Sequence, residues 1–312
     1  MNKAFIFPGQ GSQVVGMGKD FFESDKIAKS SIEEVDDALG YKLSDIIFNG
    51  TMEVLSVTTN TQPAIMAVSV AILRVLCVRS GKKIEELCKY VAGHSLGEYS
   101  ALCSSGVLSL SDTAKLLKIR AHSMQTASPV GEGAMAACIG IGAQNLQKII
   151  DEVVDEGICE LANDNVEGQI VISGHNDNID RMVAVLKDTG YKAIKLNVSA
   201  PFHSSLIKSA EKPMQEAISK TKFLGPIVPI ISNYTADVEV KTDRIKENLI
   251  SQICGTVKWR QTMDKLHQLG ITELVEIGPG KVLSNLAKKS GIDFKISSIS
   301  NIDELNAYIS TI

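Results

Sequence analysis

The sequence predicts an α/β protein that combines a large part, built on a mainly parallel sheet, with a smaller inserted unit. Along most of the 312 residues, short apolar runs alternate with longer helical segments, which is the order found in layered α/β proteins. Between 134 and 196 the order becomes strand, helix, strand, strand, helix, strand, as in a ferredoxin-like unit. We therefore expect a large subdomain made of 1–128 and 200–312, and an inserted ferredoxin-like subdomain at 129–199.

The first 128 residues supply the first strands and helices of the large subdomain. The apolar run 4–7 indicates a buried strand, and the small and branched residues of 62–78 indicate a helix that packs against the sheet. The elements expected in order are a strand at 4–7, a glycine-rich turn at 8–13, helices at 30–39 and 62–78, a strand at 90–92, and helices at 98–103 and 115–124, the last capped by Ser111 and Asp112.

The inserted unit and the C-terminal part continue this alternation. In the insert we expect strands at 134–141, 158–162, 169–173 and 191–196, with helices at 143–156 and 177–189. After a proline-bent loop at 197–204 we expect helices at 205–221, 243–253 and 282–289, and strands at 229–232 and 273–277.

Composition excludes several classes of protein. The net charge of −4 gives no basic field for nucleic acid. The apolar start of the chain is too short for a signal peptide, and no later run is expected to reach membrane-spanning length. The six cysteines are scattered without a C-x-x-C pair. We expect a cytoplasmic protein with reduced thiols and no bound metal.

The run Gly93-His94-Ser95-Leu96-Gly97 follows an apolar strand and precedes a helical segment. G-x-S-x-G in this context is typical of a nucleophile elbow, a sharp turn that exposes a serine between strand and helix. The glycines let neighbouring backbone pack close to the turn, and the helix directs its first N–H groups toward the serine. The motif predicts a nucleophilic Ser95 and makes the large subdomain α/β-hydrolase-like.

Two other glycine-rich stretches do not fit phosphate-binding loops. In the turn at 8–13, the third glycine of a dinucleotide fingerprint would fall on Val14. The stretch 278–281 lacks both the spacing and the Ser or Thr that a P-loop requires. We expect the first turn to bring the backbone and side chain of Gln10 close to a ligand, and the second to lead into a helix.

A serine hydroxyl is a weak nucleophile until a base takes its proton, so Ser95 needs a histidine partner. Five histidines are available. His94 lies on the elbow itself, where its ring would point away from the serine oxygen. Two others are expected inside helices and one in a turn of the insert: His122, His267 and His175. His203, in the loop that re-enters the large subdomain beside the carboxyl ends of the strands, is the predicted base.

The base and the developing oxyanion need further partners. No acid between Ser95 and His203 is an obvious third member of a triad, and a backbone carbonyl near Gln252 could accept the imidazole N–H instead. An oxyanion hole needs two N–H donors, and Leu96 and Gln10 are the candidates. Arg120, on a predicted helix, is either a solvated surface residue or a bidentate clamp for a carboxylate.

Together these residues resemble one family, the malonyl-CoA:acyl carrier protein transacylases of fatty acid synthesis, which are related to polyketide synthase acyltransferase domains. The resemblance spans the whole chain. The motifs that carry it are Phe7-Pro8-Gly9-Gln10-Gly11-Ser12-Gln13, Gly93-His94-Ser95-Leu96-Gly97-Glu98, Ala200-Pro201-Phe202-His203-Ser204 and Glu276-Ile277-Gly278-Pro279-Gly280-Lys281-Val282-Leu283, with Arg120, Asn163, Asn233 and Gln252 at matching positions.

The resemblance implies a ping-pong transfer of malonyl from coenzyme A to the phosphopantetheine thiol of acyl carrier protein. It implies that Ser95 carries the acyl group, that His203 is its base and that Arg120 pairs with the malonyl carboxylate. The roles of the oxyanion donors and of the Gln252 carbonyl match those expected above. Asn163 is expected to line the cleft, and the ring of Phe202 to leave little room for a 2-methyl branch.

Three alternatives stay open at this point. A serine esterase or thioesterase would use the same elbow but let water resolve the acyl-enzyme. A transferase serving a polyketide assembly line in trans would use the same site, and a non-catalytic scaffold would keep only the fold. We expect malonyl-CoA and acyl carrier protein as partners, no cofactor because the coenzyme A thioester is a substrate, and a monomer.

Overall fold

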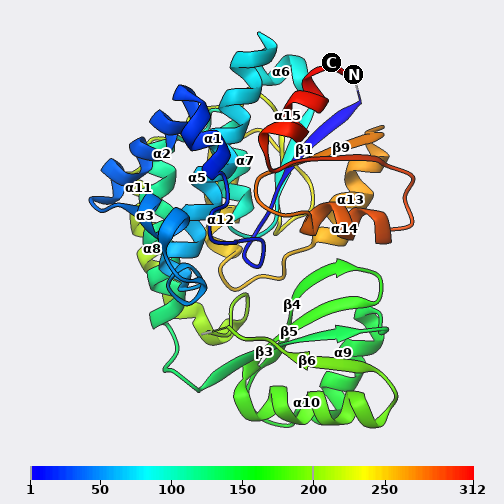
Figure 1. Cartoon of the computed structure of the whole chain (residues 1–312). Helices are drawn as coiled ribbons and strands as arrows, with labels where there is room; N and C mark the ends of the chain where they lie inside the picture. Colours follow the sequence, from blue (N-terminus) through cyan, green and yellow to red (C-terminus); the bar gives the residue numbers. More distant parts are fainter. Residues whose placement is uncertain (1, 199) are drawn as a thin grey trace.

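The computed structural model describes residues 2–198 and 200–312 and contains two sheets. Figure 1 shows a large body of helices around one sheet, with a second, smaller sheet and its two helices below it. The larger sheet is mostly parallel and the smaller one is antiparallel. The predicted fold class is therefore confirmed.

The large sheet is organised around its central strand, β1 (Lys3–Phe7). Its order is β10-β9-β1-β2-β7-β8, and all neighbours are parallel except the short edge strand β8, which runs antiparallel to β7. The bounds of the other strands are β2 (Tyr90–Gly93), β7 (Ile230–Ile231), β8 (Val238–Glu239), β9 (Glu273–Ile277) and β10 (Lys295–Ile299).

The register of β1 and β2 positions the site. Phe7, the last residue of β1, is paired with Gly93, the last residue of β2. Because parallel neighbours end at the same edge of a sheet, the loops that follow these two strands lie side by side. The glycine-rich turn at 8–13 and the elbow at 94–96 therefore meet although more than 80 residues separate them.

Helices cover both faces of this sheet. Side chains alternate along β1, so Phe5 and Phe7 contribute to one buried cluster while Ala4 and Ile6 contribute to another. The first cluster is formed chiefly with α2, α5 and α8, and the second with α13 and α14. The helices are α1 (Lys19–Ser24), α2 (Lys26–Leu39), α3 (Leu43–Asn49), α4 (Met52–Leu55), α5 (Thr58–Ser80), α6 (Ile84–Leu87), α7 (Gly97–Ser104), α8 (Leu110–Thr126), α11 (Glu211–Lys220), α12 (Thr242–Ser251), α13 (Trp259–Gln268), α14 (Val282–Lys289) and α15 (Ile302–Ile309), with a 3₁₀ helix, η1, at Ser205–Ala210.

The long helix α5 corrects one expectation. Among the described residues it is a helix long and apolar enough to cross a membrane, contrary to the expectation that no run reaches that length. However, 83% of the most apolar 18-residue stretch of α5 is buried inside the fold. A helix that is apolar on all sides suits the middle of a large core as well as a bilayer, and α5 is such a core helix.

Two further details differ from the sequence prediction. The N-cap of α8 is Ser109, whose hydroxyl accepts the N–H of Asp112, so the helix starts before the predicted Ser111 cap. The segment expected as one helix at 205–221 begins as the 3₁₀ helix η1, within which Ile207 has non-helical backbone angles, and continues as α11. No residue range was predicted for β8, β10, α1, α3, α4, α6, α13 or α15, although His267 was expected to lie inside a helix.

The small sheet is formed by β3 (Gly133–Ile139), β4 (Cys159–Val166), β5 (Gln169–His175) and β6 (Lys192–Lys195), in the order β4-β5-β3-β6. All neighbours are antiparallel, and α9 (Ala143–Val153) and α10 (Asn176–Asp188) connect the strands. This is the ferredoxin-like order. All four strands fall within 129–199, while the subdomain boundaries themselves stay a prediction. The backbone of Asn163 bridges to Val257 of the large part, which ties the two sheets together.

Candidate active site

Ser95 occupies a strained turn between β2 and α7. Its φ is +54°, in the left-handed region that residues other than glycine seldom adopt. A Cβ on Gly93 would overlap the backbone of Gly97, and a Cβ on Gly97 would overlap the backbone of Phe7. The two motif glycines therefore allow the turn to close against itself and against the end of β1. This is the elbow that the sequence predicts.

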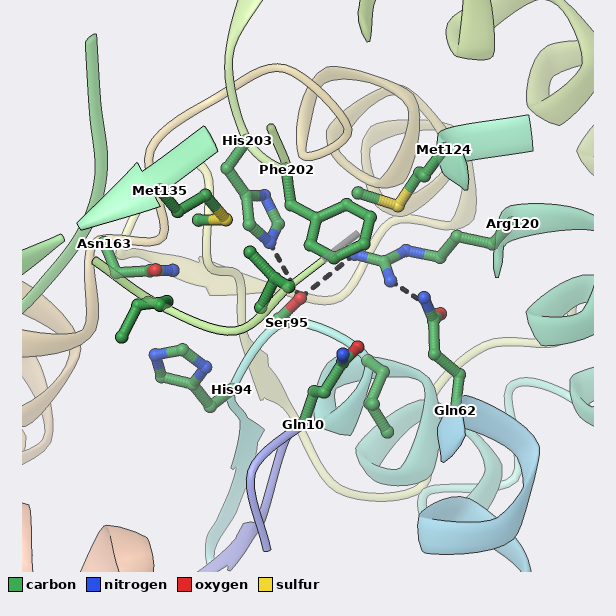
Figure 2. Close-up of a pocket in the computed structure, with 13 residues that line it drawn as sticks. Gln10, Gln62, His94, Ser95, Arg120, Met124, Met135, Asn163, Phe202 and His203 are labelled. Atoms are coloured by element: carbon green, nitrogen blue, oxygen red, sulfur yellow. Dashed lines mark hydrogen bonds between the residues drawn. The ribbon is translucent and has the colours of Figure 1, made fainter. Parts of the chain in front are cut away.

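Ser95 and His203 form a hydrogen-bonded pair (Figure 2). The Oγ of Ser95 lies 2.8 Å from Nε2 of His203, and Nδ1 of His203 lies 2.8 Å from the backbone oxygen of Gln252. A carbonyl oxygen can only accept, so Nδ1 carries the proton and Nε2 presents its lone pair to the serine hydroxyl. His203 is 96% buried and has a φ of +58°. The structure thus brings together the predicted nucleophile, base and carbonyl.

The surroundings of His203 keep its ring neutral. Burial, followed by the charge of Arg120, lowers the pKa of His203 to about 3, although the hydrogen bond to Gln252 opposes the change. A neutral imidazole with a free Nε2 lone pair is the form that can accept the proton of Ser95.

This shift predicts a pH dependence of stability. In the unfolded chain His203 takes up a proton below its ordinary pKa of 6.5, whereas in the folded protein it stays neutral down to about 3. The unfolded state therefore binds more protons, and this group lowers the free energy of unfolding by about 1.4 kcal/mol for each pH unit below 6.5. Denaturant titrations between pH 6.5 and 4 should show a smaller decrease for His203→Asn than for the parent. Equal slopes would contradict the buried, neutral histidine.

Arg120 is also buried and is aimed at Ser95. Its guanidinium donates to Oε1 of Gln62 at 2.7 Å, to Oε1 of Gln252 at 2.8 Å and to the Oγ of Ser95 at 3.1 Å. All three acceptors are uncharged, so among the described residues no carboxylate is hydrogen-bonded directly to this buried cation. The exposed fraction of only 1% rules out the solvated surface residue considered above. The remaining alternative, a clamp for a carboxylate, fits a buried cation at the wall of a cavity.

The two predicted oxyanion donors also meet at Ser95. Leu96 directly follows the serine at the start of α7, and Gln10 lies in the turn after β1. Both residues line the same cavity as Ser95. Within residues 2–198 and 200–312, neither backbone N–H has a hydrogen-bond acceptor. Two unpaired N–H groups beside a nucleophile are what an oxyanion hole requires.

The cavity above Ser95 has a volume of about 120 Å³, and residues from both the large part and the small sheet line it. Asn163 comes from the small sheet, whereas Phe202 comes from the loop that returns to the large one. The lining residues that sequence analysis did not identify are Gln62, Met124, Met135, Leu196 and Val198. Their positions read as ordinary helix, strand or loop residues, and no local motif distinguishes them.

Hydrogen bonds from Asn233 and Gln252 hold the elbow in place. Oδ1 of Asn233 accepts the backbone N–H of Ser95 at 2.6 Å, and its Nδ2 donates to the backbone oxygen of Gly93 at 2.6 Å. Nε2 of Gln252 donates to Oε2 of Glu98 at 2.6 Å. Glu98 is an acid between Ser95 and His203 that sequence analysis did not recognise as a candidate, and it reaches His203 only through Gln252.

The other histidines have separate surroundings, as expected. His94 lines the cavity, but its Nε2 lies 2.8 Å from Oδ1 of Asn165, so its ring is bonded away from Ser95. His122 and His267 lie on α8 and α13, and His175 ends β5. Within the part of the chain that the structure describes, no group of three or more His, Cys, Asp and Glu residues is arranged to hold a metal ion.

Known proteins are similar to this chain over nearly its whole length. The acyl transferase domain family matches residues 4–300. The malonyl CoA-acyl carrier protein transacylase of Bacillus subtilis (strain 168) is 42% identical over 311 residues, 99% of this chain and 96% of the relative. The Escherichia coli (strain K12) protein of the same name is 39% identical over 287 residues, 92% of each chain.

Solved structures of malonyl transferases are also similar to this chain over its whole length. The acyl-carrier-protein S-malonyltransferase from Bartonella henselae superposes with a TM-score of 0.97 at 47% identity, covering 100% of this chain and 99% of the other. A malonyl-transacylase in complex with its type II PKS acyl-carrier protein superposes with a TM-score of 0.96 at 33% identity, covering all of both chains.

Proposed function

Because this chain belongs to the malonyl CoA-acyl carrier protein transacylase family, we propose that it moves a malonyl group from malonyl-CoA to the phosphopantetheine thiol of acyl carrier protein, in support of fatty acid synthesis. The observation that carries this proposal is the buried Arg120, whose guanidinium lies 3.1 Å from the nucleophile. A cation placed there suits an acyl group that ends in a carboxylate.

In the first half-reaction Ser95 is acylated. His203 takes the proton of the Ser95 hydroxyl at Nε2, and the serine oxygen attacks the thioester carbonyl of malonyl-CoA. The negative charge that develops on the carbonyl oxygen is stabilised by the N–H groups of Gln10 and Leu96. When the tetrahedral intermediate collapses, the C–S bond breaks, and coenzyme A leaves as a thiol with the proton that His203 had accepted.

The second half-reaction runs the same steps with the other thiol. The phosphopantetheine thiol of acyl carrier protein gives its proton to His203, and its sulfur attacks the carbonyl of the malonyl-Ser95 ester. The same two N–H groups stabilise the oxyanion. Collapse breaks the C–O bond, His203 returns the proton to Ser95, and the malonyl thioester of the carrier leaves. Side chains, two backbone N–H groups and the two thiols perform every step of this scheme, and the proposal includes no cofactor.

The cavity walls define the acyl group in this proposal. Arg120 pairs with the distal carboxylate of malonyl, and the ring of Phe202 limits room at the 2-position. Asn163 lines the opposite wall, on the small sheet. A cavity of about 120 Å³ suits a short acyl group rather than a long chain.

Replacing Arg120 by alanine tests the carboxylate clamp. We expect kcat/KM for malonyl-CoA to fall by about 10³-fold, since a charge-assisted bidentate pair in a buried site is lost. Acetyl-CoA has no carboxylate and gains nothing from Arg120, so acetyl transfer should change by less than about tenfold. Steady-state rates with both thioesters measure the two effects. Equal losses for both substrates would remove Arg120 from substrate recognition.

Intact-protein mass spectrometry tests the acyl-enzyme itself. Incubation with malonyl-CoA alone should add one malonyl group, located on Ser95 by peptide mapping. A protein that keeps the fold without the chemistry, the scaffold alternative, would show no adduct. His122→Ala on the exposed side of α8 is a suitable control, because this residue lies outside the cavity.

The remaining expectations concern the setting of the enzyme. We propose that it works in the cytoplasm as a monomer, with malonyl-CoA as its thioester donor and acyl carrier protein as its thiol acceptor. A polyketide pathway in trans would use the same chemistry, and the 33% identical relative in complex with a type II PKS carrier keeps that as the second candidate. Comparing transfer rates to a fatty acid carrier and a polyketide carrier decides between the two.

A further inference from the structure

Glu98 is a buried carboxylate that the proposed reaction does not use. It lies in the first turn of α7, three residues after the nucleophile, and is 97% buried. A carboxylate in the interior is costly unless its oxygens are paired. Its Oε2 accepts the side-chain Nε2 of Gln252 at 2.6 Å and the backbone N–H of Asn233 at 3.1 Å.

Both of these partners hold other parts of the site. The side chain of Gln252 accepts from Arg120, and its backbone oxygen accepts from His203. Asn233 accepts the backbone N–H of Ser95 through Oδ1. Glu98 therefore lies one hydrogen bond away from the residues that contact the cation, the base and the nucleophile, while it contacts none of the three itself.

The Glu98 contact decides which way the Gln252 amide faces. An amide has one acceptor and one donor end, and either can face a given partner unless a neighbour selects between them. Glu98 can only accept at Oε2, so it requires the NH₂ end of Gln252, and this turns Oε1 toward Arg120. The nearby backbone oxygen of Ser95, at 3.1 Å from Nε2, supports the same orientation. Oε2 remains an acceptor whether the carboxyl is ionised or carries a proton on its other oxygen.

We propose that Glu98 is a positioning residue for malonyl transfer: it fixes the Gln252 amide and thereby holds the Arg120 guanidinium where the substrate carboxylate binds. This inference rests on the proposed function and deepens it. Without Glu98, only the longer contacts to the backbone oxygen of Ser95, at 3.1 Å, and to Oδ1 of Asn233, at 3.5 Å, hold this orientation. Gln252 can then turn its NH₂ end toward Arg120, where two donors face each other. Arg120 then loses an acceptor and is displaced from the cavity wall.

The test compares malonyl and acetyl transfer in matched variants. Glu98→Met keeps the length of the side chain but has no acceptor oxygen, and we expect the malonyl-to-acetyl ratio of kcat/KM to fall at least tenfold, mainly through KM for malonyl-CoA. Glu98→Gln keeps an acceptor oxygen for both partners, so its ratio should stay within threefold of the parent. If thermal melting shows that Glu98→Met does not fold, Glu98→Asp replaces it. Its malonyl-to-acetyl ratio should fall by the same amount, because its shorter carboxylate does not reach Gln252.

A matched control separates positioning from a loss of stability. Glu276 is another fully buried glutamate that accepts two backbone N–H groups, those of Leu283 and Ser284, but it lies outside the cavity. Glu276→Gln should lower the melting temperature without changing the ratio. A folded Glu98→Met or Glu98→Asp protein with the parent's ratio would overturn the inference. If the parent itself fails to transfer malonyl, the proposed function fails instead, so the two failures are distinguishable.

Discussion

Ser95→Ala is expected to abolish the malonyl adduct and to lower the transfer rate by about 10⁵-fold. The reason is that the hydroxyl is the atom that forms the acyl bond, and the oxyanion donors alone recover only a small part of the catalysis. Alanine should tolerate the turn about as well as serine, because the cost of the left-handed φ of +54° comes from the Cβ atom, which both residues have. The measurement is adduct formation by mass spectrometry together with the rate of carrier malonylation.

A buried serine on the helix that follows the elbow provides the control for this variant. Ser100 lies on α7, is fully buried, and has no hydrogen-bond partner for its Oγ within the described residues. Ser100→Ala should therefore form the adduct at the parent's rate. An adduct that persists in Ser95→Ala would show that another nucleophile carries the acyl group and would contradict the site described here.

His203→Asn is expected to lower the rate of both half-reactions by about 10⁴-fold, the upper range for loss of a general base and acid. Asparagine is chosen because it tolerates positive φ, so the strained backbone at +58° is retained. The variant still has its nucleophile and oxyanion donors, and hydroxide can remove the serine proton. Its residual rate should therefore rise with pH, whereas the parent, with a histidine that is neutral above pH 3, should be flat over the same range.

Single-turnover acylation measured from pH 6 to 9 distinguishes these profiles. A His203→Asn protein with the parent's acylation rate would mean that another group accepts the proton. His94 is the other histidine that lines the cavity, and its bond to Asn165 makes it a poor substitute.

The sequence was sufficient for the parts of the site that local motifs encode. The elbow needs glycines at fixed offsets, so Ser95 and Leu96 could be predicted from five residues. His203 and Gln10 followed from their loops at the ends of strands, and the strand order of the insert followed from its alternation of elements. The kink at Ile207 inside η1 was not predictable, because one residue with non-helical backbone angles leaves the helical pattern of 205–221 unchanged.

The parts that were missed depend on contacts between distant residues. Glu98 lies within the motif, but its partners Asn233 and Gln252 are more than 130 residues away, so nothing local indicates a carboxylate with a role. Gln62 reads as the polar start of an apolar helix until Arg120 is placed beside it. The edge strand β10 alternates weakly and is half-exposed, which gives little hydrophobic signal.

The central claim is that a thiol, and not water, resolves the acyl group on Ser95. The direct measurement is to incubate the protein with labelled malonyl-CoA, with and without acyl carrier protein, and to follow free malonate and malonyl-carrier over time. We expect malonyl-carrier to form rapidly when the carrier is present, and free malonate to appear far more slowly when it is absent. Free malonate released without carrier as fast as malonyl-carrier forms with it would contradict the transferase and identify a thioesterase.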